Sequence, residues 1–288
     1  MNATFSTTKE SLNSILFDVE KVENPAIAQG YNTLSTEQFA VIGQTGENEE
    51  TILNYCSDRY SLVKNSEIYP ELEKLLSMHP KTKDFNRHVT NRNNVNFMVR
   101  YTFPTLETKI NKNDSIMAGF DVWNSYDGKR NFGGSIFEYR LICSNGMMGM
   151  AQLLKISNRH TEVVKEAVER MFIEAVSAIE AFEMQSAKYE LLAQNKQQAQ
   201  WEERLTTIAE KSGIVKFHEE AKAIVRAEAK ELYNGEVNDF LIYNALNNVT
   251  FDDTLNKKAY EVRVKTDEKV FNNLMAFINT PTKQLIEN

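Results

Sequence analysis

The sequence predicts an α+β protein, an antiparallel β-meander followed by a long-helix part with a coiled-coil-like pattern. Hydrophobic and polar side chains alternate along residues 95–103 and 132–143, as they do in strands that bury one face. After the turn at 144–146, helix-forming residues dominate to about residue 235. The expected parts of the 288-residue chain are an N-terminal segment (1–35), an antiparallel sheet domain with one helix (36–157) and a helical part packed on or projecting from the sheet (158–288).

Short runs with strand-like patterns, separated by turn residues, predict the sheet domain. The expected strands are 39–43, 51–55, 59–63, 85–90, 95–103, 116–124 and 132–143. The only helix expected between them spans 67–77, with Ser66 as its N-cap and Pro80 beyond its end. Pro104 should end its strand, because proline cannot donate to a β-ladder. The pair Gly133-Gly134 indicates a bulge or a close approach of backbone.

The helical part begins with the longest helix expected in the chain, from about residue 158 or 161 to residue 193. Its apolar residues follow a spacing of three and four, which is typical of a coiled-coil-like stripe. Such a stripe must be covered by another helix of the same chain or of a second chain, so we expect a homo-oligomer. The later helices are expected at 201–213, 214–233, 240–246 and 267–278.

Composition bounds the class of protein. With 42% hydrophobic and 25% charged residues, the chain resembles an ordinary globular protein. No run approaches the roughly 18 apolar residues of a membrane span, and the start lacks a signal-peptide pattern. Cys56 and Cys143 stand in no CxxC or Cys/His motif, which favours reduced cysteines. We therefore expect a cytoplasmic protein with no membrane contact.

The charge is distributed unevenly. The net charge of −7 argues against nucleic-acid binding over the whole surface. Residues 81–165, however, carry 13 Lys and Arg against 7 Asp and Glu, so the rest of the chain carries −13. This asymmetry allows a local anion-binding face, although scattered solvated charges would give the same count.

The sequence contains no recognisable catalytic motif. The four histidines are far apart, and neither HExxH nor a Cys/His cluster is present. The phosphate-loop pattern GxxxxGK[ST] and the GxSxG elbow are also absent. Asp121 and Asp127 alone would not assemble a metal-dependent nuclease. We expect no enzyme activity, no metal site and no cofactor.

Basic residues interleaved with aromatic ones are the remaining lead, because single-stranded nucleic acid is bound by cations that follow the backbone and rings that stack on bases. The candidate nucleic-acid-binding residues are Lys129, Arg130, Arg140, Arg100, Arg92, Arg87, Tyr126 and Phe132. Tyr126 and Phe132 should be exposed beside the turn that carries Lys129. Arg130 and Arg140 should share one face of a strand. Alternatively, the aromatic rings belong to the core, and Arg140 pairs with an acid on the sheet.

The stretch 134–146, with Arg-Leu-Ile-Cys-Ser-Asn-Gly at 140–146, resembles the uncharacterised phage/plasmid-like protein family, a domain of unknown function found on mobile elements. Supporting pieces are Ser-Asp-Arg-Tyr at 57–60, Arg-His-Thr at 159–161 and Leu-Ile-Tyr-Asn-Ala-Leu at 241–246. The resemblance implies a phage or mobile-element setting, in the cytoplasm of a host cell, and supplies no catalytic residues. The order of strands and helices is also similar to that of phage single-strand annealing proteins, which is an analogy of plan only.

Two functions remain open. The first is a non-catalytic phage or mobile-element protein that binds single-stranded DNA in recombination or annealing. The second is a phage interaction protein that assembles through its helices and inhibits a host protein as a counter-defence. A basic groove favours the first, and an acidic surface that mimics another molecule favours the second.

Overall fold

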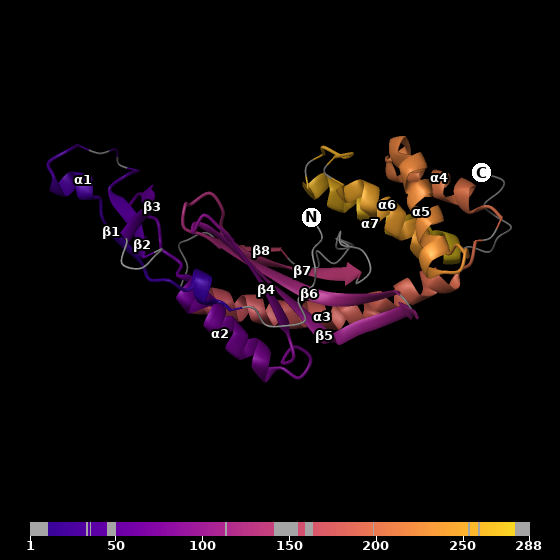
Figure 1. Cartoon of the computed structure of the whole chain (residues 1–288), viewed down its shortest axis with the longest axis horizontal. Helices are drawn as coiled ribbons and strands as arrows, with labels where there is room; N and C mark the ends of the chain where they lie inside the picture. Colours follow the sequence, from indigo (N-terminus) through magenta and orange to yellow (C-terminus); the bar gives the residue numbers. More distant parts are fainter. Residues whose placement is uncertain are drawn as a thin grey trace.

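The computed structural model describes residues 11–32, 34, 36–44, 50–112, 114–140, 155–158, 164–197, 199–252, 254–258 and 260–279. It contains helices and two antiparallel sheets, so the α+β class is confirmed (Figure 1). Among the described residues, no helix is long and apolar enough to cross a membrane.

The smaller sheet has three strands in the order β1-β2-β3, and Figure 1 shows it at one end of the molecule, away from α4 to α7. It consists of β1 (Val19–Glu23), β2 (Phe39–Gln44) and β3 (Glu50–Cys56), with the short helices η1 (Asn13–Ile15) and α1 (Pro25–Ala28) before and after β1. The expected hairpin of β2 and β3 is confirmed. Its connection at 45–49 lies outside the described residues.

The strand expected at 59–63 is wrong, because this segment is held by a side chain instead of a β-ladder. The Lys21 ammonium of β1 donates to the backbone carbonyls of Asp58 and Tyr60, both at 2.8 Å. The chain then enters α2 (Asn65–Met78), close to the expected helix. Lys64 occupies the N-cap position, so the expected N-cap, Ser66, lies inside the first turn.

The larger sheet is a five-stranded meander in the order β4-β5-β6-β7-β8. Its strands are β4 (Asn86–Arg92), β5 (Asn96–Asn111), β6 (Asp114–Ser125), β7 (Phe132–Arg140) and β8 (Lys155–Asn158). The end expected at Pro104 is wrong, since β5 continues past it to Asn111. The pairing of β5 with β6 shifts register between Thr102 and Glu107, and this irregularity accommodates a residue that has no N–H to donate.

One face of this sheet is apolar and packs on α2 and α3 (Val164–Gln194), which lie along the same side in Figure 1. The Tyr69 hydroxyl of α2 reaches the Val122 carbonyl at 3.4 Å. Gly134 is the expected close approach, because a Cβ there would lie 2.6 Å from Cε2 of Phe120 and 3.0 Å from the sulfur of Met171. We call the side of the large sheet that packs on α2 and α3 the helix face.

The described side chains of the apolar stripe of α3 are buried within the chain. Its buried side chains include Met171, which meets the sheet, and Tyr189, whose ring lies 5.9 Å from that of Phe240 and 5.5 Å from that of Phe271. The coiled-coil-like pairing expected from the spacing is therefore not what buries these described side chains.

The remaining helices are α4 (Trp201–Ser212), η2 (Val215–Phe217), α5 (His218–Leu232), α6 (Asp239–Phe251) and α7 (Tyr260–Asn279). They follow the expected helices, but α6 and α7 are longer. Residues 239–247 of α6 are all buried, as is typical of a helix at the centre of a bundle. α6 packs against α3, α5 and α7, so it is the core of the helical part.

Candidate nucleic-acid interface

The second face of the large sheet carries polar side chains, and we call it the polar face. β-Pairing aligns Arg100 of β5 with Asp121 of β6, and Asp121 with Ser135 of β7. Arg100 donates from Nε and Nη2 to the two carboxylate oxygens of Asp121, each at 2.8 Å. This bidentate pair fixes the Arg100 guanidinium against the sheet and neutralises much of its charge.

Three cations gather near one end of the polar face. Pairing places Arg92 of β4 opposite Asn96 of β5, and Asn96 opposite Ser125 of β6. The Ser125 hydroxyl donates to the Arg130 carbonyl at 2.7 Å and accepts from the Arg130 N–H at 3.1 Å. Arg92, at the end of β4, and Arg130, in the turn after β6, thus lie near the same end of the sheet, and Lys129 precedes Arg130 in the turn.

Arg130 lies over an aromatic ring, with its guanidinium carbon 4.4 Å from the centroid of Trp123. Burial lowers the pKa of Arg130, the charge of Asp121 opposes that change, and the charge of Arg92 lowers the pKa further. The charge of Arg92 thus reaches Arg130, although it is the smallest of these influences on the Arg130 pKa. An anion placed between the two guanidinium groups would relieve their repulsion.

Lys129 projects from the β6–β7 turn, where Gly128 has a positive φ of 67°. Its backbone N–H donates to Oδ1 of Asp127 at 3.1 Å, and Oδ2 of Asp127 accepts from Asn96 at 3.0 Å. The Lys129 side chain is 84% exposed, and its ammonium lies 3.8 Å from Asp127. We call Arg92, Trp123, Lys129 and Arg130 the basic corner.

Arg87 lies away from the basic corner, although it was expected to join it. Because side chains alternate along β4, Arg87 lies on the opposite face from His88 and Arg92. It forms an ion pair with Glu73 of α2. The Tyr101 hydroxyl also donates to Glu73, at 3.3 Å. Arg87 therefore belongs to the contact between the sheet and α2.

The expected exposure of Tyr126 and Phe132 is wrong, since both are buried. The Tyr126 ring packs against Phe97 at 5.0 Å between centroids, and its hydroxyl accepts the Asn65 N–H at 2.9 Å. Phe132 shares the alternation of Gly134 and points to the helix face. Neither ring is available for stacking on a base.

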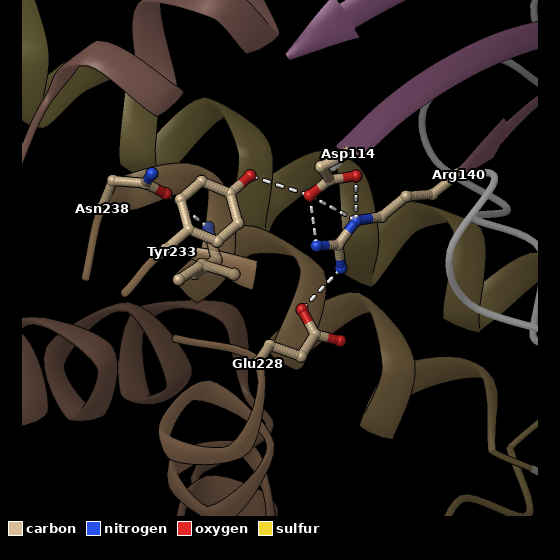
Figure 2. Close-up of polar contacts among 6 residues, drawn as sticks. Asp114, Arg140, Glu228, Tyr233 and Asn238 are labelled. Carbon is tan, nitrogen blue, oxygen red and sulfur yellow. Dashed lines mark hydrogen bonds and ion pairs between the residues drawn. The ribbon is translucent and has the colours of Figure 1, made fainter. Parts of the chain in front are cut away.

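Arg140 lies on the opposite face from Arg130, so the expectation that they share a face is wrong. Arg130 precedes β7 and turns over Trp123, whereas Arg140 ends β7 on the helix face. Arg140 is 1% exposed, and its Nε donates to both carboxylate oxygens of Asp114, at 2.8 and 2.9 Å (Figure 2). A second nitrogen, Nη1, donates to Glu228 of α5 at 2.6 Å.

The buried cluster around Arg140 has a structural role. The Tyr233 hydroxyl donates to Asp114 at 2.7 Å, which ties the end of α5 to the β5–β6 hairpin (Figure 2). Burial alone would lower the pKa of Arg140, but the hydrogen bonds and charges of Asp114 and Glu228 raise it, so the guanidinium remains charged. Arg140 is therefore occupied in joining the sheet to the helical part.

Sequence reasoning omitted Trp123 from the candidate residues. The signal that could have found it is the alternation within 116–124, which places Trp123 in phase with Asp121 and out of phase with the apolar Val122. Of the predicted residues, the structure brings together Arg92, Lys129 and Arg130, with Arg100 one step along the same face.

No group of three or more His, Cys, Asp or Glu side chains that could hold a metal ion occurs in the described ranges. No curated protein and no solved structure matches the chain. One family model, a domain of unknown function, matches residues 52–273 and so spans most of the chain, from β3 to α7. The protein belongs to this family, DUF932.

Proposed function

We propose that this protein binds single-stranded DNA without catalysis, through the basic corner of the polar face. The observation that carries the proposal is that Arg92, Lys129 and Arg130 lie near one end of the polar face, with Arg130 over Trp123. Cations that follow a phosphate backbone are one part of the arrangement that single-strand binding proteins use, and the flat guanidinium of the exposed Arg130, which lies over the buried Trp123 ring, offers a surface for a base. Arg100, held by Asp121, extends the same face.

The overall charge supports a local site. A chain with a net charge of −7 repels a polyanion over most of its surface, so binding must depend on a restricted patch. Phosphates would approach Arg92, Lys129 and Arg130, while a base could stack on the Arg130 guanidinium, which covers the buried Trp123 ring. In keeping with the resemblance to phage and plasmid proteins, we place this activity in recombination or annealing on a mobile element.

The alternative proposal is an interaction protein that assembles through its helices and inhibits a host factor. It has less support, because the described side chains of the apolar stripe of α3 are already covered by the sheet, α6 and α7.

We expect the Lys129→Glu, Arg130→Glu double variant to bind a fluorescent oligodeoxythymidylate more weakly than the wild type, because two cations become anions. A control variant, Lys257→Glu, Lys258→Glu, makes the same change of charge at two exposed neighbours between α6 and α7. Fluorescence anisotropy at low salt measures the affinities. The proposal requires a large loss in the first variant and little change in the control.

Equal losses in the two double variants would show an unspecific charge effect and contradict the proposal, as would no binding by the wild type. The single variant Lys129→Glu keeps the test valid if Arg130 is needed for folding, since the Lys129 side chain is 84% exposed. Exposed ion pairs contribute about 0–1 kcal/mol, so this variant should fold normally.

A further inference from the structure

Two acidic side chains are buried where the large sheet meets the helical part. Glu138 of β7 is 0% exposed and Asp267 of α7 is 1% exposed. Both act electrostatically on Tyr189 of α3 and Tyr243 of α6, so the four groups form one cluster. We call these residues the acidic junction.

Asp267 is held by hydrogen bonds from α6. The Tyr243 hydroxyl donates to Oδ2 at 3.1 Å, and the Asn247 amide donates to Oδ1 at 2.9 Å. The rings of Tyr189 and Tyr243 stack at 5.6 Å between centroids, with an interplanar angle of 29°. These contacts join α3, α6 and α7 at one point.

Glu138 lacks comparable partners. Within the part of the chain that the structure describes, neither of its carboxylate oxygens has a partner in hydrogen-bonding geometry, and the Tyr189 hydroxyl interacts with Glu138 only weakly enough to lower its pKa in part. Arg140, two residues along the same face of β7, faces carboxylates directly. A buried carboxylate that lacks such pairing is so costly that the protonated form is favoured.

The charged groups around the acidic junction do not reverse the preference of Glu138 for its protonated form. Burial raises the pKa of Glu138 to about 8, and the charge of Asp267 adds to this rise. The interaction with the Tyr189 hydroxyl and the charge of Lys188, which is exposed on α3, lower the pKa of Glu138 in part. Burial likewise raises the pKa of Asp267 to about 7, against the hydrogen bonds of Asn247 and Tyr243, and the exposed Glu268 beside it adds to the rise.

We propose that Glu138 and Asp267 form a proton-operated latch, which holds α6 and α7 against α3 and β7 while both acids are protonated and loosens this contact when they ionise. Ionisation would place two negative charges beside the Tyr189–Tyr243 stack. Separation of the helices from the strand would admit water to both carboxylates. The latch responds to pH in the neutral range.

The sign of the effect follows from proton binding. In the unfolded chain both acids ionise near their ordinary values of about 4, whereas the folded protein retains their protons to about pH 7 and 8. Between these limits the folded state binds more protons, so stability falls as pH rises. Each acid that stays protonated only in the folded state raises the unfolding constant about tenfold per pH unit.

The first test is denaturant unfolding of the wild type, Glu138→Gln and Glu210→Gln between pH 5.5 and 9. Glutamine imitates the protonated acid, so Glu138→Gln should lose about one factor of ten per pH unit from the slope below pH 8. Glu210, exposed on α4, is the control and should leave the slope unchanged. Parallel profiles for all three proteins would overturn the latch.

The second test locates the loosening. At pH 9 we expect amides of α6 and α7 to exchange hydrogen faster in the wild type than in Glu138→Gln, while those of β4 and β5 exchange at equal rates. Equal exchange throughout would contradict the proposal.

If Glu138→Gln fails to fold, the Asp267→Asn variant and infrared spectroscopy of the wild type decide the question. A protonated carboxyl band at pH 6 that disappears by pH 9 is expected. The absence of that band at pH 6 would overturn the proposal.

Discussion

Replacing Arg140 with alanine is expected to lower the free energy of unfolding by about 3–5 kcal/mol, because the change leaves buried carboxylate charge without its partner. Asp114 is 2% exposed and receives both Nε and Nη2 of Arg140. Glu228 and Tyr233, both in the helical part, bind Arg140 and Asp114 respectively. The lost stability should therefore include the contact between the sheet and the helices. Denaturant unfolding monitored by circular dichroism measures the change.

A matched comparison separates the buried cluster from ordinary basic residues. Lys129→Ala removes an exposed cation, and its effect should stay within about 1 kcal/mol. The double variant Asp114→Leu, Arg140→Met should be more stable than Arg140→Ala alone, because it removes the stranded carboxylate together with its partner. If Arg140→Ala costs no more than Lys129→Ala, the structural role assigned to Arg140 is wrong.

Replacing Phe120 with alanine should destabilise the protein by about 3–5 kcal/mol, through lost burial and a cavity on the helix face. Phe120 is 1% exposed, and its ring lies over the backbone of Gly134. Gly134→Ala should cost about 1–3 kcal/mol in the wild type, because the new Cβ would meet that ring. Thermal and denaturant unfolding give both values.

The double variant shows whether the ring causes the cost at Gly134. In the Phe120→Ala background, most of the penalty of Gly134→Ala should disappear, because the remaining neighbour, Met171, is flexible. Additive effects of the two changes would mean that Gly134 is required for another reason.

Much of the fold was predictable because it depends on local periodicity. The alternation along β5 and β7 and the three-and-four spacing along α3 are short-range patterns, and they placed these elements correctly. The continuation of β5 beyond Pro104 was not predictable, since it depends on a register shift against β6. Likewise, the spacing in α3 does not reveal whether its stripe meets the same chain or another.

The site was harder to predict, because strand alternation does not say which face is covered. Tyr126 and Phe132 border a turn rich in polar residues, yet the packing of α2 and α3 decides that their rings are buried. Arg140 meets Asp114 and Glu228, which are 26 and 88 positions away in sequence. The acidic junction brings together four elements of structure, and no local pattern marks it.

The most direct test of the proposed function is a salt titration of single-stranded DNA binding. If Arg92, Lys129 and Arg130 each release a counterion, log affinity against log salt should have a slope of about −2, since each contact contributes about −0.7. The Lys129→Glu, Arg130→Glu variant should retain a slope no steeper than about −0.7. A slope of about −2 for the wild type and a shallower slope for the variant would support DNA binding at the basic corner. Equal slopes for the two proteins would contradict it.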